Sequence, residues 1–282
     1  MATVISTINL KGGVGKSTTT VAVAEMMSAE FGKKVLVIDL DPQTNATVML
    51  IGEKKWRQLN EEGNTLAQLF KDALEPEGKS FDIKKAIQKR VSNVADVGTL
   101  DLLPSSLDLI DVQDRLASMS SGKFYAENPV DILRRATRSI IDNYDVVLID
   151  CPPNLGIITL NGLRISDGYI IPTIPDVLST YGIPQIVSRI KQFSDTIAEP
   201  IEAFGIVVSK YREQSTVHKE GLRQMKRKPD APLFDSIIPE NNQIAGAAEF
   251  KPVSTLRQKW GYQGQFDHYR ALTEEILARA GI

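Results

Sequence analysis

Cysteine is almost absent from this sequence: Cys151 is the only one in 282 residues. A single cysteine excludes a disulfide framework within the chain. It also excludes iron–sulfur clusters and zinc sites that need several thiolate ligands. Histidine is scarce as well, since only His218 and His268 occur and they lie far apart in the sequence. A zinc site built from histidines therefore has little support, and the lack of disulfides fits a reducing compartment.

Long apolar runs and a strong net charge are also missing. No stretch approaches the about 20 continuous apolar residues that a membrane-spanning helix needs. The apolar N-terminal segment leads into a glycine-rich loop without a signal-peptide cleavage site, so we expect a cytoplasmic protein. The net charge of −2 gives the whole molecule no strong attraction for polyanions. Any contact with nucleic acid would therefore need a local basic patch.

Short apolar runs rich in β-branched residues are separated by helical patterns. Their alternation is typical of an α/β fold with a doubly wound, mostly parallel sheet flanked by helices. We expect residues 1–282 to form a single domain, without an N-terminal helix-turn-helix domain. Residues 53–99 have mixed charge and are expected to form short helices and loops. The predicted strands are residues 4–8, 35–39, 100–103, 146–150, 169–171, 204–208 and 237–238.

A glycine-rich loop with two lysines follows the first predicted strand and opens the first predicted helix, which should end near Gly32. The loop matches the end of a Walker A motif, although Leu10 stands where the strict motif has its first glycine. Glycines let backbone N–H groups approach phosphate oxygens. Lys16 can reach the β- and γ-phosphates of ATP, and the Ser17 hydroxyl can bind Mg²⁺. A glycine-rich turn without function is the alternative. The loop consists of Lys11, Gly12, Gly13, Val14, Gly15, Lys16, Ser17 and Thr18.

Carboxylates stand at the ends of two predicted strands. Asp39 ends the strand at 35–39 and is followed by Asp41, and Asp150 ends the strand at 146–150. The carboxyl ends of neighbouring parallel strands meet in one crevice, so these groups should face the phosphate loop. We interpret Asp150 as a Mg²⁺ ligand, Asp41 as the group that orients the attacking water, and Asp39 as a second candidate metal ligand. Helix N-caps are the alternative role for all three.

These motifs resemble those of the ParA/MinD family of deviant Walker A ATPases. The phosphate loop is similar to the Walker A box of that family. Residues 39–47 are similar to its second box in the ParA form, and residues 150–156 with 159–161 to the ParA Walker B segment. Residues 238–241, followed by 251–253, are similar to a late segment near the nucleotide base. The resemblance spans nearly the whole chain and implies a P-loop NTPase fold with ATP and Mg²⁺ as cofactors.

The resemblance also implies an ATP-sandwich homodimer. In such a dimer Lys11 reaches the nucleotide of the partner chain. With Lys16 and Asp41 it serves a slow hydrolysis that a ParB-like or other adaptor protein stimulates, and hydrolysis acts as the timer of a switch. Glu240 departs from the family pattern, in which a basic residue commonly follows the preceding proline. The further nucleotide contacts that the resemblance implies are Ser209, Lys210, Pro239 and Asn241.

Three functions compete within this resemblance: a ParA-type positioning ATPase that binds DNA, a MinD-type ATPase that binds membrane, and a metabolic relative. A nitrogenase-iron-protein-like reductase needs cluster cysteines, which the lone Cys151 cannot supply. A MinD-type protein should end in a basic amphipathic helix. Residues 272–282 instead carry two glutamates and one arginine, so a membrane partner is not expected. A P-loop ligase stays open, although residues 41–45 resemble the ParA form.

A basic stretch at residues 210–228 is the candidate DNA contact. It carries seven basic and two acidic residues, and Lys219, Arg223 and Arg227 would share one helix face. Such a patch could bind DNA backbone without sequence preference. The protein would then associate with the nucleoid and position a plasmid, a chromosome or a large protein assembly. A solvated helix face is the alternative. The basic residues are Lys210, Arg212, Lys219, Arg223, Lys226, Arg227 and Lys228.

Overall fold

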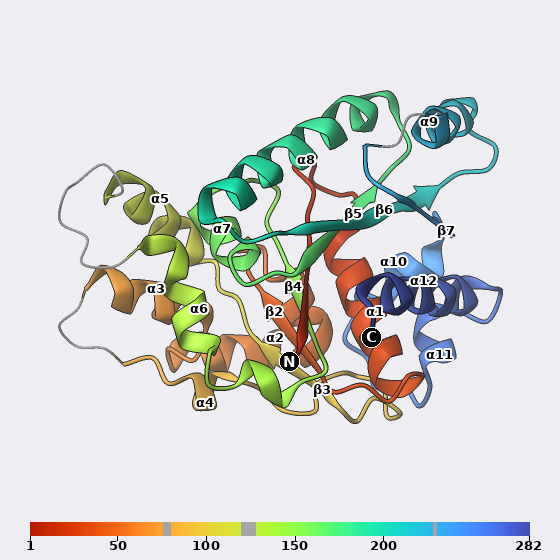
Figure 1. Cartoon of the computed structure of the whole chain (residues 1–282). Helices are drawn as coiled ribbons and strands as arrows, with labels where there is room; N and C mark the ends of the chain where they lie inside the picture. Colours follow the sequence, from red (N-terminus) through yellow and green to blue (C-terminus); the bar gives the residue numbers. More distant parts are fainter. Residues whose placement is uncertain (76–79, 120–127, 228–229) are drawn as a thin grey trace.

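All seven predicted strands are present and form one parallel sheet. The computed structural model describes residues 1–75, 80–119, 128–227 and 230–282. The strands are β1 (Thr3–Thr7), β2 (Val35–Asp39), β3 (Leu100–Leu103), β4 (Val146–Asp150), β5 (Gly168–Thr173), β6 (Glu202–Tyr211) and β7 (Leu233–Pro239). Within the described residues their order is β3-β2-β4-β1-β5-β6-β7, and all pairs are parallel (Figure 1). The doubly wound fold class is therefore confirmed.

Helices follow the strands and cover both faces of the sheet (Figure 1). The first begins in the phosphate loop, as predicted. The second is longer than the short helices expected after residue 53, and its backbone kinks at Gly52. The α-helices are α1 (Lys16–Ala29), α2 (Asn45–Glu61), α3 (Leu66–Leu74), α4 (Ile83–Ala86), α5 (Leu109–Met119), α6 (Ile132–Thr137), α7 (Ile157–Leu163), α8 (Val177–Ile197), α9 (Thr216–Arg227), α10 (Asn242–Gly246), α11 (Leu256–Trp260) and α12 (Gln265–Ala280). Two short 3₁₀ helices are η1 (Pro129–Asp131) and η2 (Ile141–Asn143).

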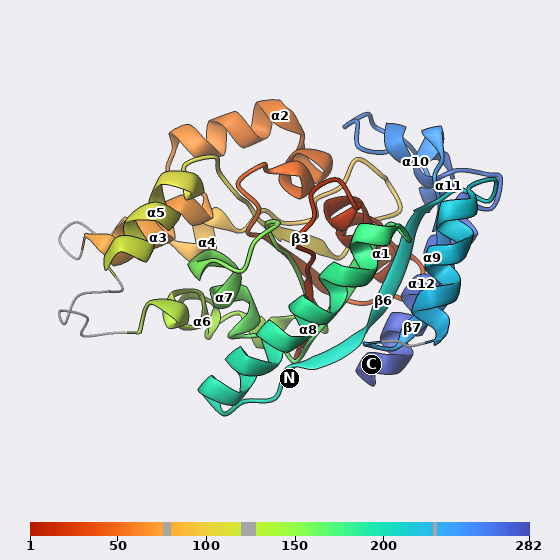
Figure 2. The same cartoon turned by 90° about the horizontal axis from the view of Figure 1, so that it is seen from above.

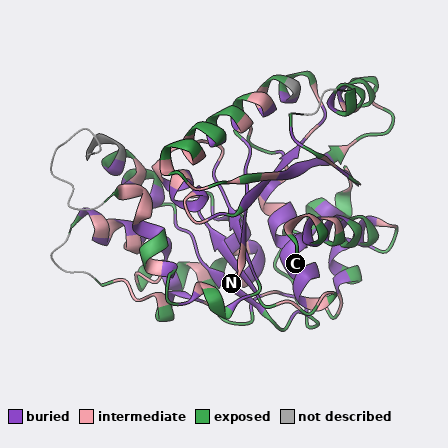
Figure 3. Cartoon of the chain, in the orientation of Figure 1, coloured by how far each residue is buried: buried purple, intermediate pink, exposed green. Residues whose placement is uncertain are grey.

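The central strands are buried on both faces, so alternate residues enter two separate cores (Figure 3). Ile5, Val35 and Val37 pack on the face covered by α1, α2, α11 and α12. Val4 and Leu36 pack on the opposite face, against α3, α5, α6, α7 and α8. Each fully buried aliphatic side chain contributes about 1.5–3 kcal/mol. The two cores therefore hold the sheet, and the loops at its edge, in a fixed position.

The strand order brings the carboxyl ends of β1, β2 and β4 together. From β1 the chain passes to β2 in one half of the sheet, and from β4 it passes to β5 in the other half. Such a reversal creates a crevice at the carboxyl ends of the strands, where ligands of parallel α/β sheets bind. In register, Asp150 pairs with Thr7 of β1 and with Asp39 of β2. Two aspartates thus stand side by side next to the loop that follows β1.

The last two strands extend beyond the apolar runs from which they were predicted. β7 lies at the edge of the sheet and alternates buried with more exposed residues, so its sequence has no continuous apolar run. The pairing of β6 with β7 shifts between Val208 and Tyr211, which places an irregularity at the end of β6. Figure 2 shows α9 at this edge, where Gly221 lies against the backbone of Pro175. A Cβ at Gly221 would lie 2.2 Å from the Pro175 carbonyl oxygen, so this close approach requires glycine.

Candidate nucleotide and metal site

The phosphate loop turns through two glycines with left-handed backbone. Gly13 and Gly15 have φ angles of 75° and 86°, a region that residues with a Cβ rarely adopt. Gly15 is the N-cap of α1, so the positive end of the helix dipole faces the loop. Asn9 fixes the start of the loop. Its amide donates to the Pro172 carbonyl of β5 at 2.8 Å, and its side-chain oxygen accepts from the Lys11 N–H at 2.9 Å.

The two lysines of the loop lie in different places. Lys16 begins α1 and is only 6% exposed. Its ammonium is close enough to Asp41 and Asp150 to oppose the rise in pKa that burial causes in both carboxyl groups. Lys11 instead forms an ion pair with Asp176, the N-cap of α8, and its side chain stays partly exposed. Lys16 therefore serves the site of its own chain, whereas Lys11 is held outside it.

Asp41 presents a carboxylate to this site from a fixed turn. One of its side-chain oxygens accepts the Gln43 N–H at 2.9 Å, and its carbonyl accepts from the hydroxyl of Ser105 at 2.7 Å. Burial raises the pKa of Asp41 above its ordinary value, while the Gln43 hydrogen bond and the Lys16 ammonium oppose this rise. A carboxylate with a raised pKa is the better proton acceptor, so Asp41 suits a water molecule that must be oriented and deprotonated.

Asp150 fits a metal ion because its carboxylate has no other partner. Within the described part of the chain, neither carboxylate oxygen of Asp150 forms a hydrogen bond, and the Thr7 hydroxyl beside it is unpaired as well. Burial, reinforced by the nearby Asp39 carboxylate, raises the pKa of Asp150 well above its ordinary value. The Ser17 hydroxyl lies close enough to oppose this rise, although its geometry is not that of a hydrogen bond. A buried carboxylate without a donor is costly, and a Mg²⁺ ion would neutralise it.

The carboxylate of Asp39, unlike that of Asp150, accepts hydrogen bonds from neighbouring residues. One oxygen accepts from the N–H and the hydroxyl of Thr47 at 2.9 and 2.7 Å, and the other accepts the Asp41 N–H at 3.0 Å. These bonds tie the end of β2 to the first turn of α2. Burial nevertheless raises the pKa of Asp39 to about 7. Because its oxygens already have donors, Asp39 is less suited to be a metal ligand than Asp150, and that predicted role stays a prediction.

Protein ligands for the metal are few. Among the described residues, no three histidine, cysteine or acidic side chains gather in a group that could hold a metal ion. Mg²⁺ commonly keeps several waters and binds one or two protein groups together with phosphate oxygens of the substrate. Ser17 and Asp150 would hold it in this way, and the bound ion would neutralise charge on the phosphates. The residues present therefore fit a Mg²⁺–nucleotide complex, not a metal held by protein alone.

Two cavities flank the phosphate loop. The larger, of about 770 Å³, lies between the loop, the end of β6 and the segment that joins β7 to α10. The smaller, of about 340 Å³, lies between the loop, Asp41 and α2. The predicted residues that line the larger cavity are Gly15, Thr18, Ser209, Lys210, Pro239 and Asn241. Those that line the smaller one are Gly12, Gly13, Gly15, Lys16, Ser17, Thr18, Asp41 and Lys210. The structure thus brings nearly all of the predicted nucleotide residues together, while Lys11 and Val14 line neither cavity.

Tyr269, Arg212 and Glu240 are among the lining residues of the larger cavity that were not predicted to bind nucleotide. Tyr269 comes from α12 and is buried, and no local motif in the sequence marks it. Arg212 and Glu240 form an ion pair that joins the end of β6 to the end of β7. Glu240 could have been suspected, since it stands between Pro239 and Asn241. The ion pair itself also explains the acidic residue at this position, because Arg212 supplies its counter-ion.

The predicted basic patch divides into two parts. Lys210 donates to the carbonyl of Gly13 in the phosphate loop at 2.7 Å, and Arg212 pairs with Glu240. Both side chains are therefore directed to the nucleotide site. Lys228 lies outside the described residues.

The remaining basic residues are on the surface of α9. This helix buries Gly221 and Met225 and turns its cations outward, as the predicted helical spacing requires. A single carboxylate on the helix, Glu220, pairs with Arg223 at 2.7 Å. The exposed cations are Lys219, Arg223, Lys226 and Arg227.

A buried ion pair supports the helix that follows the loop. Glu25 of α1 accepts from the ammonium of Lys259 at 2.7 Å and from the indole N–H of Trp260 at 2.8 Å. The Ser92 hydroxyl donates to the same carboxylate at 2.6 Å. Buried charges persist only with such partners. The network therefore fixes α1 against α11 and against the loop before β3.

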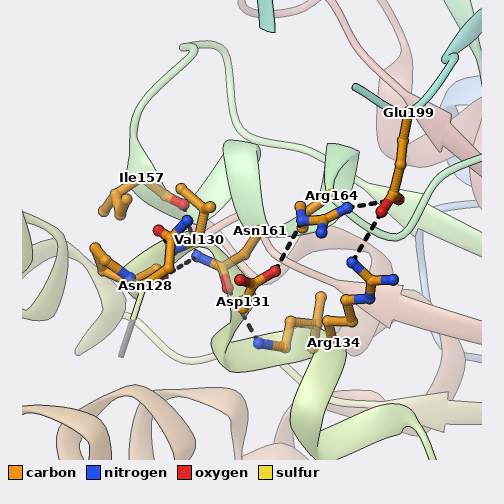
Figure 4. Close-up of polar contacts among 10 residues, drawn as sticks. Asn128, Val130, Asp131, Arg134, Ile157, Asn161, Arg164 and Glu199 are labelled. Carbon is orange, nitrogen blue, oxygen red and sulfur yellow. Dashed lines mark hydrogen bonds and ion pairs between the residues drawn. The ribbon is translucent and has the colours of Figure 1, made fainter. Parts of the chain in front are cut away.

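Part of the segment that resembles Walker B has a scaffolding role away from the two cavities. Asn161 is buried in α7, and its side-chain oxygen accepts from the Leu133 N–H of α6 at 3.0 Å. Figure 4 shows this region, where Arg164 joins Asp131 and Glu199 at 2.7 and 2.5 Å. These contacts hold α6, α7 and the turn after α8 together. Asn161 thus positions a helix and does not touch the nucleotide cavities.

Comparison with known proteins agrees with this geometry. A family model described as an AAA domain matches residues 2–203. The chromosome partitioning protein ParA of Caulobacter vibrioides is 26% identical over 279 residues, with 98% of this chain and 94% of that protein covered. The solved structure of apo McdA from Cyanthece has a TM-score of 0.77 at 21% identity and covers 98% of this chain and 100% of its own. Cobyrinic acid a,c-diamide synthase from Mycobacterium smegmatis, bound to an ATP analog and magnesium, has a TM-score of 0.73 at 25% identity, covering 97% and 93%.

The parallel sheet, the phosphate loop and the aspartates at its edge define a P-loop ATPase, and the chain belongs to the AAA domain family. Within that family it is a ParA-type member of the ParA/MinD ATPases. It accordingly binds ATP together with Mg²⁺ and hydrolyses ATP.

Proposed function

We propose that this protein is a positioning ATPase that works as an ATP-dependent homodimer. The observation that carries the proposal is the different placement of the two lysines in the phosphate loop. Lys16 already supplies the cation of its own site, and Lys11 lies outside, partly exposed and paired with Asp176. Such a cation can act on the nucleotide of a second chain once its ion pair with Asp176 opens. There it would neutralise charge that develops on the transferred phosphoryl group.

The cycle that we infer has four steps. Lys16, Ser17 and Asp150 bind Mg²⁺–ATP, and two chains then associate with their nucleotides between them. Asp41 orients the attacking water, and a ParB-like or other adaptor protein stimulates the slow hydrolysis. Loss of the γ-phosphate separates the chains. The names of the relatives, which include chromosome-partitioning proteins, support a chromosome as the cargo, and a plasmid or a large protein assembly is the alternative.

DNA is the surface to which we propose that the ATP-bound dimer binds while it positions its cargo. The exposed cations of α9 form a patch on a molecule of net charge −2. One patch gives few phosphate contacts, so a single chain should bind weakly. Dimerisation puts two patches on one body, and the second contact becomes intramolecular. DNA binding should therefore follow the nucleotide state without any change within α9.

Mixing two inactive variants tests the proposed dimer. Lys11→Ala lacks the cation that acts on the partner, and Asp41→Ala lacks the carboxylate that orients water in its own site but keeps ATP binding and dimer formation. A heterodimer of the two contains one complete site, so an equimolar mixture should recover about a quarter of the wild-type rate if the chains associate at random. Light scattering with a slowly hydrolysed ATP analogue verifies that dimers form. Heterodimers without recovered activity would contradict the proposed action of Lys11 on the partner's nucleotide.

A P-loop ligase is the second candidate, because the structure of the diamide synthase named above superimposes on nearly the whole chain. A ligase consumes ATP only when an acceptor substrate is present. ATP turnover by the purified protein without any small-molecule acceptor, increased by DNA or adaptor protein, would favour the positioning ATPase.

A membrane partner has less support. Within the described ranges, no helix is long and apolar enough to span a bilayer. The apolar residues Leu272, Ile276 and Leu277 of α12 are buried in the core with α1. That face of α12 is therefore already covered by the protein itself.

A further inference from the structure

The phosphate loop is held from the end of β6, two strands away from β1 in the sheet. The Ser209 hydroxyl donates to the carbonyl of Val14 at 2.6 Å, and the Lys210 ammonium donates to the carbonyl of Gly13 at 2.7 Å. Ser209 is almost fully buried. Two consecutive carbonyls of the loop are thus fixed by two consecutive side chains of β6.

The geometry of the peptide bond relates the direction of each held carbonyl to the direction of the following N–H group. In a planar trans peptide the carbonyl of one residue and the N–H of the next point in opposite directions. Because the carbonyl of Gly13 points to Lys210, the N–H of Val14 points to the opposite side of the peptide. The same holds for the carbonyl of Val14, which points to Ser209, and the N–H of Gly15. These N–H groups stand at the start of α1, where a phosphate would bind.

The loop needs such an anchor because its sequence is permissive. Gly12, Gly13 and Gly15 adopt positive and negative φ with similar ease, so the peptides between them could rotate. A rotated peptide would present a carbonyl to the phosphate and repel it. The hydrogen bonds from β6 remove that freedom before any nucleotide arrives.

The backbone of β6 departs from regular geometry at the same place. Lys210 has a φ of 50°, which is disfavoured for a residue with a Cβ. The pairing of β6 with β7 also shifts here, and such irregularities redirect side chains near functional sites. A regular strand would not direct the side chains of two consecutive residues to one loop, because they point to opposite faces. The irregularity lets Ser209 and Lys210 both reach it.

We propose that Ser209 and Lys210 are positioning residues that preorient the phosphate loop. They act on nucleotide through the Val14 and Gly15 N–H groups, in addition to lining the cavity. The inference rests on the nucleotide site described above. Their effect should fall on the affinity for nucleotide phosphates, which ATP and ADP share. KM and the Kd for Mg²⁺–ADP should therefore rise when an anchor is lost, while kcat changes little.

Matched variants of the full chain test this. Ser209→Thr keeps the hydroxyl, and Ser209→Val has the same shape without it, so any packing effect of the added methyl group is shared. Isothermal titration with Mg²⁺–ADP should give about fivefold weaker binding for Val than for Thr, the usual effect of one lost hydrogen bond. Lys210→Met should weaken binding by a similar factor, whereas Lys210→Arg should retain most of it. Lys85→Met, at an exposed position of α4, is the control and should bind like the wild type.

Thermal unfolding without nucleotide separates positioning from folding. Equal Mg²⁺–ADP affinities for the Thr and Val variants would overturn the proposal. So would an affinity loss that follows the loss of thermal stability, or a fall in kcat with KM unchanged. Failure of the wild-type chain to bind Mg²⁺–ADP would instead overturn the nucleotide site itself, a result distinguishable from the others.

Discussion

Raising the pH from about 5 to about 7 should destabilise the protein in the absence of nucleotide. Asp39 and Asp150 stand side by side at the strand ends, and burial raises the pKa of both carboxyl groups. A carboxyl group whose pKa is higher in the folded chain holds its proton more tightly there. It contributes stability that is complete below the pKa of the unfolded chain and is lost as the pH rises to the folded pKa.

The magnitude follows from Asp39. Its pKa rises from 3.8 to about 7, and each unit corresponds to about 1.4 kcal/mol. Between pH 5 and 7 the titration of Asp39 should therefore lower the free energy of unfolding by at most about 3 kcal/mol, and Asp150 and Asp41 act in the same direction. Asp176 and Asp267 do not offset this change, since their ion pairs with lysine and arginine lower their pKa and they titrate at more acidic pH.

Urea unfolding at several pH values measures the effect. Asp150→Asn should reduce the slope, because it removes a second carboxyl group whose pKa burial raises, and neither oxygen of Asp150 loses a hydrogen bond. Asp142→Asn, at an exposed position, is the matched control. Saturating Mg²⁺–ADP should also flatten the slope, since a bound cation favours ionised carboxylates. Wild-type stability that is constant or rises between these pH values would refute the reasoning.

Three substitutions test the site and its support. Lys16→Ala should abolish ATP turnover and greatly weaken binding of an ATP analogue, and an unchanged affinity in isothermal titration would remove Lys16 from the site. Asp41→Ala should keep ATP binding and an ATP-dependent dimer but slow hydrolysis by about a hundredfold or more. A variant that hydrolyses ATP at the wild-type rate would contradict its role. Glu25→Gln should cost about 3 kcal/mol or more in urea unfolding, because Lys259 is left buried without a counter-ion. A loss below about 1 kcal/mol would show that Lys259 finds another partner.

The fold could be predicted where the sequence signal is local. Central strands such as β2 and β4 are covered on both faces and therefore appear as continuous apolar runs. The edge strand β7 was recognised only in part, because its exposed positions are polar. The length of α2 was missed since Gly52 interrupts its pattern, although the helix continues past the kink with Phe250 packed against that glycine.

The residues of the site also divide into those that a local motif predicts and those that only the fold brings together. The phosphate loop and Asp150 could be found because each depends on a short motif beside a strand. The partner of Lys11 could not, since Asp176 is distant in the sequence and its ordinary signal is that of a helix N-cap. The basic stretch at residues 210–228 shows that charge composition alone does not predict where each basic side chain lies. Lys210 and Arg212 belong to the same run of charge as α9, yet their backbone position at the end of β6 directs them to the nucleotide site.

The most direct test of the positioning function is DNA binding in each nucleotide state. Fluorescence anisotropy with unrelated duplexes should show binding with a slowly hydrolysed ATP analogue and little with ADP, and binding should weaken steeply with salt because counterions are released. Changing Lys219, Arg223 and Arg227 to alanine should flatten the dependence on salt while nucleotide affinity persists. If the triple variant bound DNA as well as the wild type, the cations of α9 would form a solvated helix face that does not contact DNA. A wild-type chain that ignores DNA in every nucleotide state would contradict the account.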